Sequence, residues 1–384
     1  MKKGLVLEGG AMRGLFTCGV IDVFMENGIE FDGAVGISAG AVFGCNIKSK
    51  QIGRPLRYNL NYCRDKRYGS LSSLLKSGDL YDAKFCYEQL PETLDPFDTE
   101  TFKNNPMAFY VGATDVKSGK CVFHKCINGG KEDLKWMQAS ASMPLVSQIV
   151  KVDGLELLDG GIADSIPLKF LEGQGYERNV VVCTQPKGYV KKKNKLMPIL
   201  NLVYRDYPLM IDALKKRHIM YNHEIKEIEW KLRHERIFVI RPQKSLKVGR
   251  MEKNPDELKR VYEEGRKQAE AQLSALKEFL AAKELPLKDE KEMVRVRKHF
   301  RFFGTVQGVG FRFQAMMAAD ALGLSGWVAN ESDGSVTMEI QGSEDEISSC
   351  LEMISNSRYI HIERMEEKQI DLLENESSFS AKYW

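Results

Sequence analysis

The sequence FDGAVGISAGAVFG, residues 31–44, joins a short apolar run to an Ala-rich segment through a serine that has glycines two residues to either side. This order predicts a buried β-strand that turns at once into a helix. Gly36 to Gly40 fits the pattern G-x-S-x-G, in which the glycines leave room for a sharp turn that pushes the serine hydroxyl outward. The partial positive charge of a helix N-terminus favours alkoxide-like states of that hydroxyl. Ser38 is therefore the candidate nucleophile, and the first two thirds of the chain can be arranged around it.

A glycine-rich turn precedes this stretch. Residues 3–8 (KGLVLE) are a β-rich run, followed by GGAMRG at 9–14 and by an apolar helical pattern to about Asn27. Strand, turn and helix in this order predict the first βα unit of a parallel sheet. Since both βα turns open at the same edge of such a sheet, we expect this turn to face Ser38.

Three interpretations of the turn compete. A dinucleotide fingerprint would need glycine at the position of Ala11 and an acid at the end of the second strand, whereas Asp32 lies at its beginning. A structural turn would only allow close packing of helix and sheet. The interpretation that we favour is an oxyanion hole, because successive backbone N–H groups at a helix start point at an anion.

An aspartate is the best candidate partner for Ser38. Leu155 to Leu158 is an apolar strand that leads into Asp159 and two glycines, although such a sequence is most often only a turn. His124 is the last residue of a strand pair predicted at 107–116 and 120–124, and it is the only histidine before residue 200. A lone histidine on a strand is more often a partly satisfied surface or core residue.

The motifs together resemble those of the patatin-like phospholipases. The matching motifs are GGAMRG at 9–14, GISAG at 36–40, ASASMP at 139–144 and DGG at 159–161, and the resemblance covers about residues 1–186. It implies a three-layer α/β/α fold with a mostly parallel central sheet and a catalytic dyad of Ser38 and Asp159. Two positions depart from the family pattern: Ala11 stands where a third glycine is frequent, and Ser165 where Asn commonly precedes x-Pro.

The dyad leads to a mechanistic hypothesis. Ser38 attacks an ester carbonyl while Asp159 takes its proton, and water later hydrolyses the acyl-enzyme. A free aspartate with a pKa of about 3.9 is a poor base, so burial must make Asp159 more basic. The backbone N–H groups of Gly9, Gly10 and Ala11 would hold the oxyanion, and Arg13 would order the loop or add positive charge.

A Ser-Asp-His triad is the rival mechanism, because His218, His223 and His234 follow Asp159 in the chain. All three lie in 211–234, which we predict to be one long helix. The serine turn also follows only the second strand, which is too early for an ordinary α/β-hydrolase. Replacing each histidine in turn distinguishes the two mechanisms.

The remaining segments of this part are less informative. Residues 51–105 are predicted to form short surface helices and loops around the cleft, with breaks at Pro91 and Pro96. Lys191–Lys193 and Lys195 precede an apolar stretch at 196–203, which suits either a solvated loop before a packing helix or a peripheral contact with anionic lipid. Residues 236–241 are expected to form a strand and 255–283 one long amphipathic helix.

Composition limits the class of protein. The chain has 384 residues, 43% of them hydrophobic, and a formal charge of +3, which is too small to predict a nucleic-acid partner. The 8 cysteines fit buried reduced thiols, and the spacing of Cys121 and Cys126 matches no zinc template. The apolar run after Met1 is too short for a signal peptide, and no stretch is long enough to span a bilayer. We expect a cytoplasmic location, peripheral to the membrane if the lysines contact lipid, without metal ion or cofactor.

The pattern restarts near Met293. An alternating strand over 294–303 is followed by the loop TVQGVGFR at 305–312 and by a helix rich in Ala and Met. A glycine-rich loop at a helix start, with Arg312 beside it, makes a phosphate-sized cradle. A hairpin around Asp333 and a second helix near 343–354 complete a βαββαβ order, which suggests a ferredoxin-like sandwich.

This second part resembles acylphosphatase over about residues 293–384. The matching motifs are VQGVGFR at 306–312, GLSGWVAN at 323–330 and DGSV at 333–336, with Gly310 where an aromatic residue is common. The resemblance implies that Arg312 and the loop amides bind phosphate and that Asn330 positions the attacking water. The loop residues are Gln307, Gly308, Val309, Gly310, Phe311 and Arg312. A domain that keeps the fold and binds phosphate only for regulation or packing is the alternative.

These interpretations combine into one prediction. Residues 1–283 form an α/β patatin-like acyl hydrolase domain, 284–292 a linker, and 293–384 an α+β acylphosphatase-like domain. The substrate is a lipid or another acyl ester. The alternatives are a membrane- or phosphate-binding adaptor with an idle serine, and acylphosphatase as the main activity. Oligomeric state is not predicted.

Overall fold

The computed structural model describes residues 1–282, 295–355, 357, 359–373, 376 and 378–382. The chain divides into two compact units, Met1–Leu285 and Pro286–Trp384, and each is described by itself. The expected linker, 284–292, lies outside the described residues.

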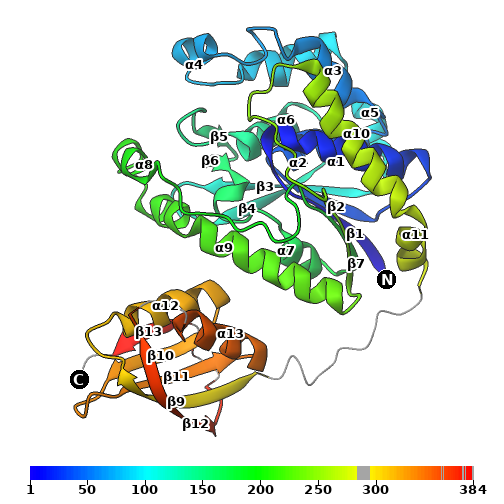
Figure 1. The fold of residues 1–384 in the computed structure, drawn as a ribbon. Helices are drawn as coiled ribbons and strands as arrows, with labels where there is room; N and C mark the ends of the chain where they lie inside the picture. Colours follow the sequence, from blue (N-terminus) through cyan, green and yellow to red (C-terminus); the bar gives the residue numbers. More distant parts are fainter. Residues whose placement is uncertain (283–294, 356, 358, 374–375, 377, 383–384) are drawn as a thin grey trace. The chain divides into compact units, whose positions relative to one another are not determined.

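The first unit is built on an eight-stranded sheet (Figure 1). The sheet is mostly parallel, as predicted. The strand order is β5-β6-β3-β2-β1-β7-β8, with β4 paired to β3. The strands are β1 (Lys2–Leu7), β2 (Gly33–Ile37), β3 (Ala108–Asp115), β4 (Cys121–Cys126), β5 (Val150–Val152), β6 (Leu155–Asp159), β7 (Tyr176–Val182) and β8 (Ile237–Ile240). Strands β4, β5 and β6 join antiparallel, and the others run parallel. The two expected βα turns therefore leave the same edge, after β1 and β2.

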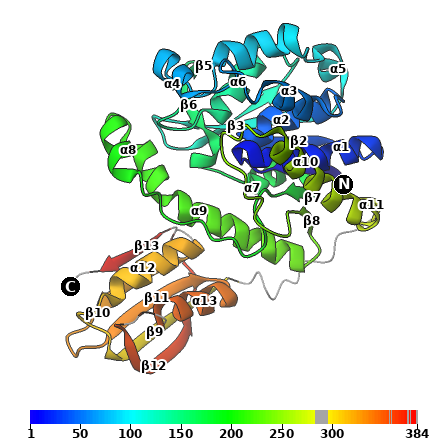
Figure 2. The ribbon, with the colours of Figure 1, turned by 45° about the horizontal axis from the view of Figure 1, so that its top comes forward.

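Helices cover both faces of this sheet. On β1, Leu5 and Leu7 belong to one apolar cluster and Val6 to another, as expected for a strand buried on both faces. The first cluster includes residues of α1 (Gly14–Glu26), α2 (Ala39–Lys48), α6 (Lys131–Ala141) and α10 (Pro255–Ala271). The second includes residues of α7 (Leu168–Gly173) and α9 (Pro208–Arg233). Figures 1 and 2 show these two helical layers on opposite sides of the sheet.

Three predictions for this unit need correction. The expected helix over 255–283 is two helices, α10 and α11 (Leu273–Ala281), separated at Gln272. Pro91 does not break a helix but lies inside a π-helix, η2 (Phe85–Leu94). The short strand β5 was not expected, and it pairs with β6 as the outermost strand of the sheet. The other helices are α3 (Arg54–Tyr62), α4 (Leu71–Ser77), α5 (Thr99–Asn104) and α8 (Met197–Val203).

The second unit has the predicted ferredoxin-like order with one additional strand. Its elements are β9 (Val296–Thr305), α12 (Phe311–Leu322), β10 (Ser325–Asn330), β11 (Val336–Gly342), α13 (Glu344–Ser355), β12 (His361–Ile370) and β13 (Phe379–Lys382). The sheet order is β12-β9-β11-β10-β13, and β13 lies parallel to β10. One face of the sheet packs on α12 and α13 through an apolar cluster that includes Phe300, Val328 and Met338. The long antiparallel pairing of β10 and β11 brings Asn330 opposite Val336 at the hairpin end.

Candidate active site

Ser38 lies on the sharp turn between β2 and α2. Its backbone has φ 53° and ψ −122°, in a region that non-glycine residues rarely occupy. A side chain at either flanking glycine would clash with the backbone. A Cβ atom on Gly36 would lie 2.4 Å from the carbonyl oxygen of Gly40, and one on Gly40 would lie 2.2 Å from that of Leu7. The turn can thus form only because neither residue has a side chain, as the G-x-S-x-G pattern predicts.

Ser140 on α6 holds the turn in place. The Ser38 backbone N–H donates to the Ser140 hydroxyl at 2.8 Å, and that hydroxyl donates to the Gly112 carbonyl at 2.6 Å. One buried hydroxyl therefore links the end of β2 to the middle of β3. The sequence suggested only that the small residues 139–144 pack closely, and it did not reveal this role of Ser140. The position of Ser140 within a run of small residues was the sequence feature that could have indicated this role.

Asp159 is brought to Ser38 by the end of β6. The Ser38 hydroxyl donates to Oδ2 of Asp159 at 2.7 Å, while Oδ1 accepts from the Gly161 backbone N–H at 2.8 Å. The Asp159 backbone is fixed as well, because its N–H donates to the Ser142 carbonyl at 2.7 Å and its carbonyl accepts from the Thr114 hydroxyl at 2.9 Å. Ser38 and Asp159 are only 8% and 5% exposed.

The electrostatic environment of Asp159 has opposing contributions. Burial raises the pKa of this carboxyl above its usual value, because the charged form loses hydration. The charge of Arg217 and the hydrogen bond from Ser38 act in the other direction. The balance leaves the pKa raised, so Asp159 is a stronger base than a free aspartate. Arg217, on α9, was not singled out in the sequence, and its side-chain Nε donates to the carbonyl of Gly161, two residues after Asp159.

The turn after β1 lies directly against Ser38. It continues into a short 3₁₀ helix, η1 (Ala11–Arg13), and a Cβ atom on Gly9 would lie 2.9 Å from the Cβ of Ser38. Among the described residues, the backbone N–H groups of Gly9, Gly10 and Ala11 have no backbone acceptor. Ala11 has a positive φ of 48°, which explains why glycine is favoured at this position. The structure thus brings together the expected nucleophile, its aspartate and the glycine turn.

Two cavities meet at Ser38. One is lined mainly by apolar and aromatic side chains from α2, α6 and the segment 54–97, among them Phe43, Tyr58, Tyr87 and Met137. The other is lined by the glycine turn, Asp159, the segment 189–196 and α9, and it contains several basic side chains. The helices of 51–105 thus lie around the cleft, as expected, and they form the wall of its apolar part.

Two histidines of the rival triad, His218 and His223, lie on α9, as predicted, and His234 directly follows its last residue. None of the three interrupts the contact between Ser38 and Asp159. His218 lines the basic cavity, and burial lowers its pKa below the usual value. His234 stacks on Trp230, and its Nδ1 lies 2.7 Å from the Trp230 carbonyl oxygen.

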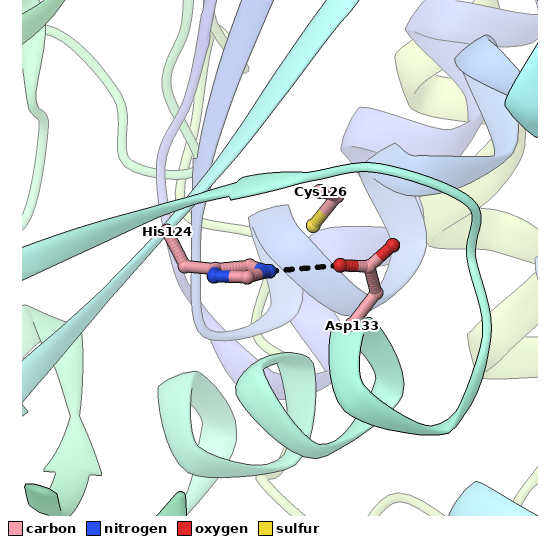
Figure 3. Close-up of side chains that lie close together, drawn as sticks. All are labelled: His124, Cys126 and Asp133. Carbon is pink, nitrogen blue, oxygen red and sulfur yellow. Dashed lines mark hydrogen bonds and ion pairs between the residues drawn. The ribbon is translucent and has the colours of Figure 1, made fainter. Parts of the chain in front are cut away.

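A separate cluster of His124, Cys126 and Asp133 has donor groups of the kinds that bind metal ions (Figure 3). One donor atom from each residue lies within 4.8 Å of the others. The Asp133 carboxylate is already satisfied, since Oδ1 pairs with His124 at 2.8 Å and Oδ2 accepts three backbone N–H groups from 127–129. His124 also stacks on Trp136. The cluster stabilises the turn between β4 and α6, and none of its members lines the cavities at Ser38.

In the second unit, the predicted phosphate loop connects β9 to α12. Gly308 and Gly310 have φ of 74° and 83°, so the loop uses the left-handed conformation that glycine favours. Gln307 fixes the loop to the neighbouring hairpin, because its amide donates to the carbonyls of Glu331 and Ser335, both at 2.7 Å. These bonds bring the loop next to the end of β10, where Asn330 lies. Arg312 is in the first turn of α12, directly after Phe311.

The fold and the site first define a class. A serine on a strand–turn–helix junction, next to a glycine turn and an acidic partner, is the arrangement of α/β serine hydrolases. Comparison with known proteins specifies it further. Family models match residues 5–171 ("Patatin-like phospholipase"), 207–281 ("Domain of unknown function (DUF6363)") and 298–381 ("Acylphosphatase").

Three relatives illustrate these matches. The "Uncharacterized protein YjjU" of Escherichia coli (strain K12) is 29% identical over 236 residues, 54% of this chain and 64% of that protein. "Acylphosphatase-2" of Rattus norvegicus is 40% identical over 89 residues, 22% of this chain and 91% of that protein. A crystal structure of acylphosphatase from Bacillus subtilis has 34% identity and a TM-score of 0.22, covering 23% of this chain and 99% of that one. The chain thus spans less than two thirds of YjjU.

The chain accordingly carries a patatin-like phospholipase domain followed by a C-terminal domain that belongs to the acylphosphatase family. Both families are hydrolases, acting on ester and acyl phosphate bonds.

The link through Ser140 leads to a testable prediction. Ser140→Ala leaves the Ser38 N–H and the Gly112 carbonyl buried without a partner, and each unsatisfied group costs about 1–3 kcal/mol. We expect a lower thermal midpoint and about a tenfold or greater loss of p-nitrophenyl butyrate hydrolysis.

Ser142→Ala is the matched control, because the Ser142 hydroxyl donates only to the Gln138 carbonyl one turn earlier. It should change stability by less than about 0.5 kcal/mol. Equal effects of the two variants would contradict the role given to Ser140.

Proposed function

We propose that the first unit is a serine acyl-ester hydrolase, a lipid acyl hydrolase that uses a Ser38–Asp159 dyad. The observation that carries this proposal is the direct 2.7 Å hydrogen bond from the Ser38 hydroxyl to a buried carboxylate whose pKa is raised by burial. The reaction has two halves. Ser38 attacks the ester carbonyl as Asp159 accepts its proton, the alcohol leaves with that proton, and an acyl-enzyme remains. Water then attacks with Asp159 again as general base, releasing the carboxylic acid and the free serine.

The surrounding groups support each step of this mechanism. The backbone N–H groups of Gly9, Gly10 and Ala11 are free to bind the oxyanion that forms on the carbonyl oxygen. Arg13 follows them in η1 and orders the turn or adds positive charge. The apolar cavity at Ser38 suits an acyl chain, and the basic cavity suits the rest of the substrate.

A triad would place a histidine between Ser38 and Asp159, and the direct contact of these two side chains supports a dyad instead. An adaptor with an idle serine is the non-enzymatic alternative. The strained backbone of Ser38 argues against it, because such strain costs about 1–3 kcal/mol and is retained mostly at functional sites.

Substitution of the dyad tests the mechanism. Ser38→Ala should abolish p-nitrophenyl ester hydrolysis, and Asp159→Asn should lower kcat/KM at least about 100-fold because the base is lost. In the parent, kcat/KM should rise with pH as Asp159 loses its proton, with a midpoint above the usual aspartate value of about 3.9. The pH profile of initial rates measures this midpoint.

Histidine variants are the control. His218→Gln, His223→Gln and His234→Gln should each retain substantial activity. A near-total loss in any one of them would replace the dyad with a triad.

For the second unit, we propose that the loop over 307–312 binds a phosphate group and that Arg312 and Asn330 hydrolyse acyl phosphates. Gln307 holds the loop beside the end of β10, and α12 begins at the loop, so its first N–H groups face the same region. Asn330 would position water there. The same geometry is compatible with two alternatives. One is that acylphosphatase is the main activity of the chain, and the other is that the second unit binds phosphate without hydrolysing a substrate.

An acyl phosphate assay separates these alternatives. The parent should hydrolyse benzoyl phosphate, and Arg312→Ala should lower the rate at least about 100-fold, because a charged phosphate ligand is lost. Asn330→Ala should lower kcat more than it raises KM. If the parent lacks this activity but binds inorganic phosphate, the second unit only binds it. Ser38→Ala, in the other unit, is the control.

We further propose that the first unit contacts anionic membrane surfaces through α8. The apolar side chains exposed at α8 form one patch, in which Leu202 is 72% exposed. Exposed lysines precede this patch in the chain. The patch consists of Leu196, Ile199, Leu202 and Val203, preceded by Lys192, Lys193 and Lys195. Leu196 and Leu200 also line the basic cavity, so this contact would place the cleft opening at the lipid. None of the described helices is both long and apolar enough to cross a membrane.

Vesicle co-sedimentation tests this contact. Reversing Lys193 and Lys195 to Glu, with Leu202→Asp, should weaken binding to phosphatidylglycerol vesicles at least about tenfold, since each basic residue near such a surface contributes about 1 kcal/mol. Lys187→Glu, an exposed residue outside the patch, is the charge control. Unchanged binding of the triple variant would eliminate the proposed surface.

A further inference from the structure

The glycine turn that faces Ser38 is held on its other side by a threonine. A Cβ atom on Gly9 would lie 2.9 Å from the Cβ of Ser38. A Cβ atom on Gly10 would instead lie 2.7 Å from Oγ1 of Thr184, the second residue after β7. The turn is therefore packed between Ser38 and Thr184. Thr184 is fully buried, so it can influence the reaction only through the turn.

The Thr184 side chain fixes the orientation of one peptide group in this turn. Its hydroxyl donates to the Gly9 carbonyl oxygen at 3.1 Å. The peptide unit that joins Gly9 to Gly10 is planar and trans, so its N–H points in the direction opposite to its C=O. The hydrogen bond from Thr184 thus directs the Gly10 N–H away from β7, to the side of the turn on which Ser38 lies. Two glycines alone would leave this peptide group free to rotate.

A buried carboxylate holds Thr184 in turn. Glu8, the residue between β1 and the glycine turn, is 3% exposed. One of its side-chain oxygens accepts from the Thr184 backbone N–H, and the other accepts from the Tyr221 hydroxyl at 2.8 Å. The Glu8 backbone N–H donates to the Val182 carbonyl at 3.1 Å, which joins the same two strands. Glu8 therefore connects the turn both to the end of β7 and to α9.

Tyr221, on α9, is fully buried and packs against Lys191. The Lys191 ammonium lies 4.0 Å from the centroid of the Tyr221 ring. The Lys191 backbone also exchanges two hydrogen bonds with the Asn222 side chain, at 2.8 and 3.1 Å. The sequence placed Lys191 in a solvated or lipid-facing lysine run, and the structure corrects this, because the side chain packs on Tyr221.

The supporting residues come from outside the segment that matches the patatin-like model. That segment is 5–171, and both Thr184 and Tyr221 lie beyond it. Tyr221 lies in 207–281, the segment matched by a family model without a known function. A residue of that segment thus contacts the carboxylate next to the glycine turn.

From this geometry we infer that Thr184 is a positioning residue for the oxyanion hole, and that the segment 207–281 supports catalysis by holding Thr184 through Tyr221 and Glu8. The inference rests on the proposed ester hydrolysis at Ser38. In its first step the Ser38 oxygen bonds to the ester carbonyl carbon, its proton passes to Asp159, and the carbonyl double bond becomes single with the negative charge on its oxygen. The Gly10 N–H, already oriented, donates to that oxygen without having to rotate.

Replacing the Thr184 hydroxyl tests this role in the full chain, with rates corrected for those of Ser38→Ala. Thr184→Val keeps the size of the side chain and the N–H that bonds to Glu8, but it releases the peptide group after Gly9. It should lower kcat for p-nitrophenyl butyrate about tenfold and change KM less than about twofold, because only stabilisation of the transition state is lost. Thr184→Ser retains the hydroxyl and should restore most of the parent kcat.

Tyr221→Phe tests the support from α9. It removes the hydroxyl that bonds to Glu8 and should lower kcat about threefold, and the double variant with Thr184→Val should lose less than the product of the two single losses, since both act on one turn. A full product would show that the two residues act independently, which overturns the role given to the segment 207–281.

Thr17→Val is the matched control. Thr17 is also fully buried, on α1, and its hydroxyl has no hydrogen-bond partner within the described part of the chain. This variant should keep the parent kcat and KM.

An inhibitor separates positioning from a general loss of folded enzyme. A trifluoromethyl ketone with a butyl-sized chain adds to Ser38 and places an oxyanion where the intermediate has one, so its Ki should rise about tenfold in Thr184→Val, in parallel with the fall in kcat. A smaller folded fraction would lower kcat and leave Ki unchanged.

The outcomes distinguish this inference from the proposed function. If the parent is active and Thr184→Val matches Thr17→Val, or loses kcat without a rise in Ki, the positioning role is overturned and the hydrolase stands. If the parent neither hydrolyses the ester nor binds the ketone, the proposed function fails and the inference fails with it.

Discussion

The first unit depends on one hydrogen bond between two buried side chains, from the Ser38 hydroxyl to the Asp159 carboxylate. Ser38 and Asp159 are 121 residues apart in the chain, so their contact requires the ends of β2 and β6 to meet at one place on the sheet. It also requires a strained backbone at Ser38, and it requires that positions 36 and 40 be glycine. Ser140 supports the same point from α6, because it joins the Ser38 N–H to β3. Backbone strain of this kind is retained mostly at functional sites, which supports the proposed catalytic role of the contact.

The charges around Asp159 determine how strongly its carboxylate can accept a proton from Ser38. Burial makes the Asp159 carboxyl more basic, whereas Arg217 makes it less so, and the first effect is the larger. The net effect is a raised pKa, which supports the proposed role of Asp159 as the group that accepts the Ser38 proton.

Much of this site could be predicted from sequence, because its main parts are short motifs whose backbone geometry is local. The turn at 36–40, the turn at 9–14 and the acid at the end of β6 each follow directly from glycine positions beside an apolar strand. In the second unit, the loop at 307–312 and the hairpin at Asp333 were predicted for the same reason. The central sheet followed from the order of strands and helices.

Other parts depend on tertiary contacts that no local pattern reveals. Arg217 is one charged residue among many on α9, and only helix packing shows that it faces Asp159. Lys191 looks like its exposed neighbours in the lysine run until Asn222 fixes its backbone. Pro91 is normally a helix breaker, but a π-helix accommodates it. The break at Gln272 interrupts a pattern that is amphipathic on both sides, so the sequence predicted one helix where there are two.

Covalent labelling measures the central claim most directly. A fluorophosphonate reacts only with an activated serine, and mass spectrometry of peptides from the labelled chain identifies the residue that carries it. The account predicts a single adduct on Ser38 that forms quickly in the parent and at least about 100-fold more slowly in Asp159→Asn, because the base is lost. An unlabelled Ser38, or equal labelling rates in the two proteins, would show that this hydrogen bond does not activate the serine.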